Sequence, residues 1–412
     1  MISLDEALDR LRAGSAAHAI AQTETVSTFD ALGRVLAEDV TSPLNVPPQD
    51  NSAMDGYALR VADAGVAGAV LPVSQRIPAG LPPQPLQPGT AARIFTGAQV
   101  PPGADTIVMQ EECVAVPGDG LGVLGGVRVP GVPVAGRWIR RQGEDVRLGA
   151  AVLHVGQRLT PQALGLAASV GKASLTVRRR PRVALFSTGD ELQMPGETLR
   201  PGAIYNSNRY TLKALAEAAG CEVIDLGIVV DTLAATRAAL REAASRADLI
   251  VTCGGVSVGE EDHLKPAARA EGDLQDWQLA IKPGKPLAFG SIRRPDGTSA
   301  LLLGLPGNPV SSFVTYLLAV SPVLRVLQGM DGGLPPSLPL RADFDWPRPD
   351  KRREFLRVRM TTEGGLDRFA NQSSGVLTSA VWADGLVDNP AGQPIRRGDT
   401  VRFLPMAALV AR

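Results

Sequence analysis

Apolar residues follow a helical period at the start of the chain. Residues 3–12 have the spacing of an amphipathic helix, and Ser3 with Glu6 forms a capping box at its beginning. A second helix is predicted over residues 28–36. The N-terminal segment is therefore expected to be helical, and its acidic character is not that of a signal peptide.

The pattern then changes to short apolar runs separated by proline and glycine. These runs occupy residues 61–134 and predict a small β domain. Helical spacing returns at residues 159–169, where Thr160 is the expected N-cap and Pro161 the first helical residue. We infer that the β domain is an insertion, from which the chain returns to its first segment.

From residue 183 onward, strand-like and helical segments alternate. The strands are expected at residues 183–187, 221–230, 249–253 and 300–303, and the helices at 206–220, 233–246 and 262–270, with a long last helix that ends at 328. This alternation predicts a right-handed βαβ array with a parallel sheet.

Beyond Pro335 and Pro336 the period becomes two. Residues 353–360 alternate in this way, and residues 400–404 do the same, which predicts a small closed or sandwiched β domain. The basic residues between Lys351 and Arg359 are expected on the solvated face of a strand.

Composition narrows the functional classes. Forty-two basic residues balance 42 acidic ones, so a general affinity for nucleic acid or for an anionic membrane is not indicated. No apolar run approaches the roughly 20 residues of a membrane span. Cys113, Cys221 and Cys253 form no CxxC motif, and a reduced, cytoplasmic location is expected.

The stretch ADLIVTCGGVSVGEED, residues 247–262, combines a buried strand with glycines and acids. Gly254, Gly255 and Gly259 allow a ligand to approach the backbone N–H groups, and Glu260, Glu261 and Asp262 follow. In an open α/β sheet this is the usual ligand crevice. The alternative is an ordinary turn whose acids start a helix.

Three strand ends deliver small residues together with an acid. Because the carboxyl ends of parallel strands share one edge, Glu191, Asp231 and Asp262 are expected to converge there and to suit a divalent metal held for phosphate chemistry. The alternative for Asp231 is an N-cap, and for Glu191 a charged helix start.

Positive charge and further backbone anion sites come later in the chain. Lys282 and Lys285, held by flanking prolines and a glycine, would supply fixed charge for an anion. Gly307-Asn308-Pro309 before the long helix offers a backbone cradle. A Walker A motif is absent from the sequence, so an ATPase function gains no support.

Seven motifs together resemble a known family. They are DNSAMDGYA (50–58), FTGA (95–98), RRQGED (140–145), FSTGDEL (186–192), CGGVSVGEED (253–262), IKPGKP (281–286) and GLPGNPVS (304–311). In this order they are similar to the molybdopterin molybdenumtransferases (the MoeA family), bacterial relatives of the C-terminal domain of gephyrin. The resemblance also includes NQSSGVL in the C-terminal β domain.

The resemblance implies a multi-domain α/β plus β fold in an elongated homodimer. Residues 1–44 and 141–178 would form a discontinuous N-terminal linker domain, and residues 45–140 an inserted β lid domain. Residues 179–329 would be the α/β molybdopterin-binding domain, and residues 330–412 a C-terminal β-barrel.

The resemblance also implies a reaction: adenylylated molybdopterin and molybdate give molybdenum cofactor and AMP, with Mg²⁺. Glu191, Asp231 and Asp262 would position the metal and the pyrophosphate, and Lys282 and Lys285 the anionic substrate. The other expected substrate-binding residues are Gly254, Gly255, Ser257, Gly259, Pro306, Gly307, Asn308 and Pro309. Asp55, Thr96 and Asp145 would complete the catalytic cleft from the partner chain.

Two alternatives remain open from the sequence. One is the upstream enzyme, which adenylylates molybdopterin and resembles only the α/β part; it is also the expected delivery partner. The other is a non-catalytic dimeric scaffold, although a scaffold could lose the motif acids that this chain retains. The sequence leaves the choice between molybdate and tungstate open.

Overall fold

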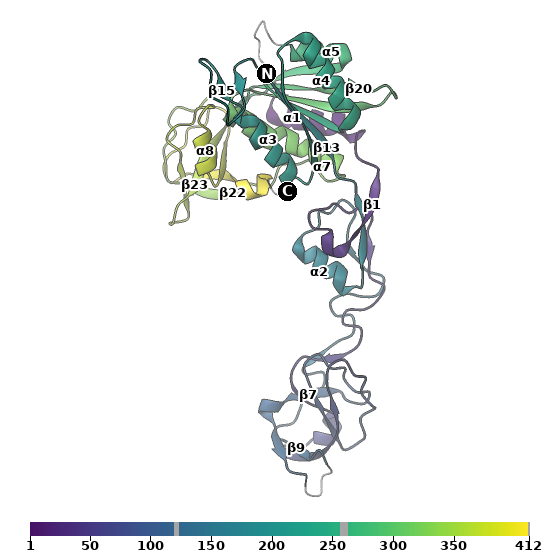
Figure 1. Cartoon of the computed structure of the whole chain (residues 1–412). Coiled ribbons are helices and arrows are strands. Elements are labelled where there is room, and N and C mark those ends of the chain that lie inside the picture. Colours follow the sequence, from purple (N-terminus) through teal and green to yellow (C-terminus); the bar gives the residue numbers. More distant parts are fainter. Residues whose placement is uncertain (119–122, 256–262, 411–412) are drawn as a thin grey trace.

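The computed structural model describes residues 1–118, 123–255 and 263–410 of the chain. Figure 1 shows an elongated molecule with an α/β domain and a β-barrel side by side at one end. A small linker part that carries helix α2 (Pro161–Ser169) lies between them and a β domain at the far end. The four predicted parts are therefore present, while their residue boundaries stay predictions.

The linker part is built from outgoing and returning chain. Three short antiparallel ladders join the two directions: β1 (Thr23–Ser27) with β12 (Ser174–Arg178), β2 (Val40–Thr41) with β11 (Ala151–Leu153), and β3 (Asn51–Ser52) with β10 (Ile139–Arg140). The predicted insertion of a β domain is thus confirmed. Thr160 caps α2 as expected, its Oγ1 accepting the Ala163 N–H at 3.3 Å.

The helix predicted over residues 28–36 is wrong. Only a single 3₁₀ turn forms there, η1 (Thr28–Asp30), and Gly33 adopts φ +72°. The backbone beyond it pairs instead with the returning chain, since the Leu36 N–H donates to Gln157 O and the Leu159 N–H donates to Arg34 O. Strand-like pairing therefore displaces local helical preference.

The inserted domain, hereafter the lid, contains one six-stranded sheet in the order β7-β4-β6-β5-β9-β8. Its strands are β4 (Gly56–Leu59), β5 (Ala69–Ile77), β6 (Ala91–Ile94), β7 (Thr106–Met109), β8 (Val114–Val116) and β9 (Gly126–Val129), with 3₁₀ turns η2 (Val61–Ala64) and η3 (Gln110–Glu112). The predicted β character of this segment is confirmed.

The α/β domain is organised around a six-stranded sheet in the order β16-β13-β17-β21-β20-β18. The strands are β13 (Arg182–Thr188), β16 (Glu222–Val229), β17 (Leu249–Cys253), β18 (Gly272–Gln278), β20 (Pro286–Arg293) and β21 (Ser299–Leu305). The first four in the sheet order run parallel, as predicted. β20 and β18 extend the sheet antiparallel, which the sequence analysis did not predict.

Helices cover both faces of this sheet. One core contains the apolar sides of α1 (Leu4–Ala16) and α3 (Ser207–Ala218), and the other those of α4 (Leu233–Arg246) and α5 (Leu264–Glu271). Ser3 caps α1 through the Glu6 N–H at 3.1 Å, as the capping box predicts. A short pair, β14 (Leu192–Gln193) and β15 (Ile204–Tyr205), lies beyond the end of β13.

One long apolar helix runs through the first core. It consists of α6 (Pro309–Thr315), a π-helical segment (Tyr316–Val320) and α7 (Ser321–Leu327). By length and composition this helix could cross a membrane, contrary to the expectation that no apolar run approaches the length of a membrane span. However, 89% of its apolar 18-residue stretch is buried inside the molecule. Burial of this kind is typical of a core helix.

The C-terminal domain is a closed barrel. Its strands follow the order β23-β24-β22-β26-β25, and β25 pairs again with β23. The strands are β22 (Leu338–Ala342), β23 (Arg353–Met360), β24 (Gly365–Arg368), β25 (Gly385–Asn389) and β26 (Thr400–Pro405), with helices α8 (Leu377–Trp382) and α9 (Met406–Val410).

The expectation that the basic residues of β23 face solvent is wrong for Arg357. Its side chain is 1% exposed and donates to Ser379 Oγ at 3.1 Å and to Phe355 O at 3.2 Å. Burial lowers the pKa of the Arg357 guanidinium to about 10. Period-two alternation does not distinguish a strand with one solvated face from a strand that is packed on both faces.

Candidate functional site

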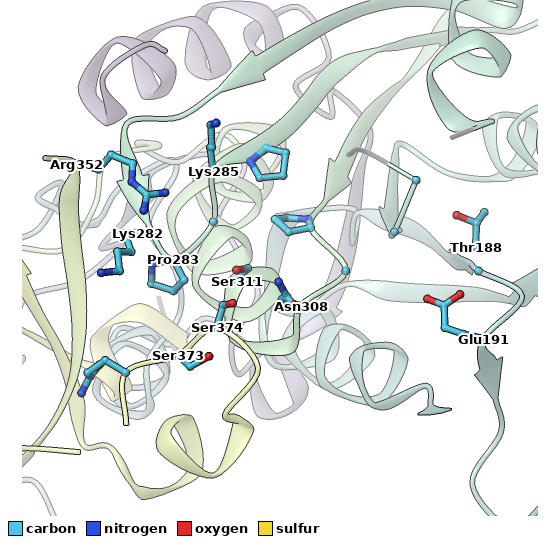
Figure 2. A pocket seen from close by; sticks show the side chains of 18 of the residues that line it. Thr188, Glu191, Lys282, Pro283, Lys285, Asn308, Ser311, Arg352, Ser373 and Ser374 are labelled. Carbon is cyan, nitrogen blue, oxygen red and sulfur yellow. The ribbon is translucent and has the colours of Figure 1, made fainter. Parts of the chain in front are cut away.

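A cavity of about 740 Å³ lies where the carboxyl edge of the α/β sheet meets the barrel (Figure 2). Nine residues predicted for the site line it: Glu191, Asp231, Gly254, Gly255, Lys282, Lys285, Pro306, Gly307 and Asn308. The cavity is therefore at the position that the strand-end argument predicted.

One end of the cavity carries carboxylates. Glu191 follows β13, and its side chain folds back over Gly189, where a Cβ would lie 2.6 Å from Glu191 Oε2. Asp231 follows β16 and lines the same cavity. The N-cap alternative for Asp231 is wrong, because Thr232 Oγ1 accepts the Ala235 N–H at 3.2 Å and so caps α4 itself.

The glycine loop after β17 closes tightly on the neighbouring strand. Gly254 has φ +92°, and a Cβ there would lie 2.6 Å from Thr188 O, so only glycine fits. This brings the loop backbone to the cavity wall. The predicted residues Ser257, Gly259 and Asp262 lie outside the described residues.

A second cavity of about 580 Å³ adjoins the first and shares Thr188, Glu191, Gly254, Gly307 and Asn308 with it. Pro309 lines this second cavity rather than the first.

Asn208 joins the two glycine loops that bound these cavities, a role the sequence analysis missed. Its Nδ2 donates to Gly307 O at 2.7 Å and to Cys253 Sγ at 2.9 Å. Only its position in the Asn-Ser-Asn capping cluster could have drawn attention to it. Burial raises the pKa of the Cys253 thiol, so this sulfur is a neutral acceptor.

The opposite end of the cavity is basic. Figure 2 shows Lys282, Lys285 and Arg352 on the side away from Glu191. Arg352 was missed because its segment looked like a solvated strand face. It is held by Asp350, which accepts from Arg352 Nε and Nη2 at 2.9 Å each, and this pairing drives the pKa of Asp350 far below its usual range.

The barrel also contributes a polar loop to the cavity. Gln372, Ser373 and Ser374 line it, within the NQSSGVL motif. The Val310 N–H donates to Ser374 O at 2.9 Å, so the loop is tied to the first turn of α6. These residues carry hydroxyl and amide groups suited to oxyanions or a polar heterocycle.

The lid residues lie elsewhere. Asp55 and Thr96 are brought together, since Asp55 Oδ1 accepts from the Thr96 N–H at 2.8 Å and from Thr96 Oγ1 at 2.7 Å. The first of these bonds contributes most to lowering the pKa of Asp55. Both residues flank lid strands, at the far end of the chain from the cavity (Figure 1). Asp145 lines a different cavity of about 440 Å³ in the linker part.

The described residues contain no group of three or more His, Cys, Asp or Glu side chains that could hold a metal ion by themselves. Glu191 and Asp231 nevertheless offer two hard oxygen donors in one cavity. Mg²⁺ usually keeps several waters and is bound through one or two carboxylates plus substrate phosphates. The pair therefore fits a Mg²⁺ ion that is shared with a phosphorylated substrate.

Three family descriptions match consecutive parts of the chain. They are "MoeA N-terminal region (domain I and II)" over residues 2–171, "Probable molybdopterin binding domain" over residues 184–326, and "MoeA C-terminal region (domain IV)" over residues 339–406. The family resemblance recognised in the sequence is confirmed.

Similar proteins cover most of the chain. A molybdopterin molybdenumtransferase of Haemophilus influenzae is 45% identical over 309 residues, which are 75% of this chain and 74% of that protein. Molybdopterin molybdenumtransferase 2 of Mycobacterium tuberculosis is 40% identical over 89% of this chain and 90% of its own length. The crystal structure of a molybdopterin biosynthesis MoeA protein from Pyrococcus horikoshii superposes with a TM-score of 0.82 at 27% identity, covering 98% of this chain and 99% of that chain.

Proposed function

The chain belongs to the MoeA family of molybdopterin molybdenumtransferases, and from this premise we propose that it inserts molybdate into adenylylated molybdopterin and releases AMP. The single observation that carries the proposal is the division of charge in the cavity. Cationic side chains line one end and Glu191 the other (Figure 2). Asp231 also lines the cavity and follows β16, the strand paired with the β13 strand that precedes Glu191. A substrate with a pyrophosphate and a second, free oxyanion requires both kinds of site.

At the basic end, Lys285 and Arg352 would bind the oxyanion. Lys285 is exposed, and no carboxylate of the described residues forms an ion pair with it, so its charge is available to a ligand. Arg352 is fixed by Asp350 with its guanidinium at the cavity wall. A point charge beside a planar donor group suits a tetrahedral anion.

At the acidic end, Glu191 and Asp231 would hold Mg²⁺, and the backbone around Gly254 and Gly307 would receive phosphate oxygens. Bound Mg²⁺ supplies charge neutralisation on the pyrophosphate as AMP leaves. The chain's own groups orient the phosphates and keep the oxyanion near the opposite wall.

We further propose that the enzyme is a homodimer in which the lid of one chain completes the cavity of the other. Asp55 and Thr96 lie at the far end of their own chain, too remote to act on its cavity (Figure 1). The lid would then deliver the low-pKa carboxylate of Asp55 to the partner's substrate. A cytoplasmic location is expected, since the three cysteines are free thiols.

The two alternatives have less support. A molybdopterin adenylyltransferase needs only an α/β domain, whereas this cavity takes Arg352, Ser373 and Ser374 from the barrel. A scaffold would not require a cavity that gathers two carboxylates and three cations. The upstream adenylyltransferase remains the expected supplier of substrate.

The test is AMP release from adenylylated molybdopterin with sodium molybdate and Mg²⁺. Glu191→Gln should lower the rate about 100-fold and raise the Mg²⁺ concentration needed for half-maximal rate, because one of two anionic oxygen ligands is lost. Glu222→Gln is the matched control, a carboxylate at the other end of the same sheet, and should behave as the wild type. A wild-type Mg²⁺ profile in Glu191→Gln would remove the metal role from Glu191.

A further inference from the structure

The loop that carries both lysines is part of the barrel sheet. Residues Ile281–Lys282 form the short strand β19, which runs parallel to β23 with Lys282 opposite Glu354. The Arg353 N–H donates to Ala280 O at 2.9 Å and fixes the approach. Lys282 is thus placed by the barrel as much as by its own domain.

Behind Lys282 lies a buried carboxylate. Glu354 is fully buried, with Oε1 3.3 Å from Lys282 Nζ and Oε2 2.7 Å from Trp346 Nε1. Asp350 Oδ2 lies 3.5 Å from the same Nζ. Lys282 is 39% exposed and lines the cavity, so its ammonium stands between the cavity and two carboxylates of the barrel.

The contacts with Glu354 and Asp350 leave only part of the hydrogen-bonding capacity of Lys282 available to a ligand. An ammonium has three N–H donors, and those directed at Glu354 and Asp350 are not available to a ligand unless the side chain moves. The two carboxylates also reduce the positive potential that an anion meets at this end. Lys285, on the same loop, has no such ion pair among the described residues.

We propose that Glu354 is a positioning residue that tethers Lys282 and thereby weakens oxyanion binding at the basic end of the cavity. The inference rests on the proposed function, because it assigns that end to an oxyanion substrate. Weak ground-state binding serves turnover, since binding the substrate and the transition state equally tightly lowers KM without raising kcat. The barrel would then set the anion affinity of a cavity that the α/β domain mostly forms.

The test uses Glu354→Gln in the full-length protein, with sodium molybdate titrated by calorimetry. The glutamine oxygen can still accept from Trp346, but its NH₂ group cannot accept from Lys282, so the ammonium is released toward the cavity. Molybdate Kd is expected to fall about fivefold. In AMP-release kinetics the KM for molybdate should fall while kcat does not rise.

A double-mutant cycle shows whether the effect passes through Lys282. In a Lys282→Met background, Glu354→Gln should lower molybdate Kd by less than it does in the wild type, because only the direct charge effect of Glu354 remains. An effect of equal size in both backgrounds would overturn the tether. The matched control is Asp343→Asn, a barrel carboxylate paired with Arg341 at 2.7 Å and not part of the cavity wall, which should not change Kd in either background.

Unchanged or weaker molybdate binding in a folded Glu354→Gln protein would overturn the tether. If that variant does not fold, Glu354→Asp replaces it, since the shorter side chain keeps the charge but withdraws the carboxylate from Lys282 Nζ; tighter binding is again expected, and no change again refutes the tether. The molybdate titration distinguishes failure of the proposed function from failure of the tether. A wild-type protein that binds no molybdate would count against the anion site of the proposed function, and with it the tether, whereas wild-type binding with an inert Glu354→Gln would count against the tether alone.

Discussion

Replacing Gly284 by alanine tests how the lysine loop is held. Gly284 has φ +105°, and a Cβ at this position would lie 2.3 Å from Thr315 Oγ1 and 3.5 Å from Ser311 O. Thr315 is fully buried in α6, so its side chain has little room to withdraw. The backbone conformation should cost about 1–2 kcal/mol and the overlap about 1–3 kcal/mol, which together predict a destabilisation of about 3 kcal/mol.

The matched control is Gly297→Ala. Gly297 has φ +83°, and a Cβ added there would meet no atom within 4 Å, so this variant should lose only about 1 kcal/mol through its backbone conformation. Urea unfolding followed by intrinsic fluorescence compares the two variants under the same conditions, and molybdate calorimetry follows the loop. Gly284→Ala should also weaken molybdate binding, because Lys282 and Lys285 flank the displaced residue, while Gly297→Ala should not.

Two results would refute this reasoning. Equal destabilisation in the two variants would mean that α6 moves away at no cost, so that the overlap with Thr315 makes no contribution to the free energy of unfolding. Wild-type molybdate binding in a destabilised Gly284→Ala protein would mean that the loop position does not matter for the anion. Partial recovery of stability in Gly284→Ala/Thr315→Ala would support the overlap, because the second substitution removes the atom that Cβ meets.

Two further predictions concern the cavity. Lys285→Ala should raise the molybdate concentration needed for half-maximal rate about tenfold, and Lys285→Arg should restore it only in part. If the molybdate dependence is unaltered in both variants, Lys285 is not part of the anion site. Asp55→Ala and Glu191→Ala homodimers should each be nearly inactive. After the two variants are dissociated together and re-pair at random, half of the dimers are mixed, and each mixed dimer has one intact cavity if the cavity uses both chains. AMP release should then recover to about a quarter of the wild-type rate. No recovery, with mixed dimers detected by native mass spectrometry, would contradict the shared cavity.

The acidic end of the cavity was predictable because it depends on local pattern and topology. Apolar runs in the sequence identified β13, β16 and β17. Because parallel strands place their carboxyl ends at one edge of the sheet, the sequence alone predicted that Glu191, Asp231 and Gly254 lie in one site. What failed there was the capping assignment. Thr232 and Asp231 are both good N-caps, and one residue of register decides which side chain faces the cavity.

The basic end was predictable only in part. Proline and glycine marked the lysine loop, but Arg352, Glu354 and Trp346 belong to a domain more than sixty residues later in the chain. Alternation in β23 predicted a strand correctly and the exposure of Arg357 incorrectly, because Ser373 and Ser379 of the barrel's own loop and helix α8 cover this side chain. Sequence periodicity reports the local element and does not report which element packs against it.

The lysine loop owes its shape to contacts on two sides. Gly284 packs against α6, and Lys282 lies in register with Glu354 on the barrel strand β23. Neither contact alone defines where the ammonium groups lie, since the first fixes the backbone of the loop and the second fixes one side chain. Helix α6 begins at the Gly307-Asn308 turn, which also lines the cavity. A displacement of the barrel would move Lys282 through its pairing with β23 and would leave the carboxylates that follow β13 and β16 in place. The separation between the two charged ends is therefore a property of the contact between the α/β domain and the barrel, and substitutions at that contact should alter anion affinity before they alter Mg²⁺ dependence.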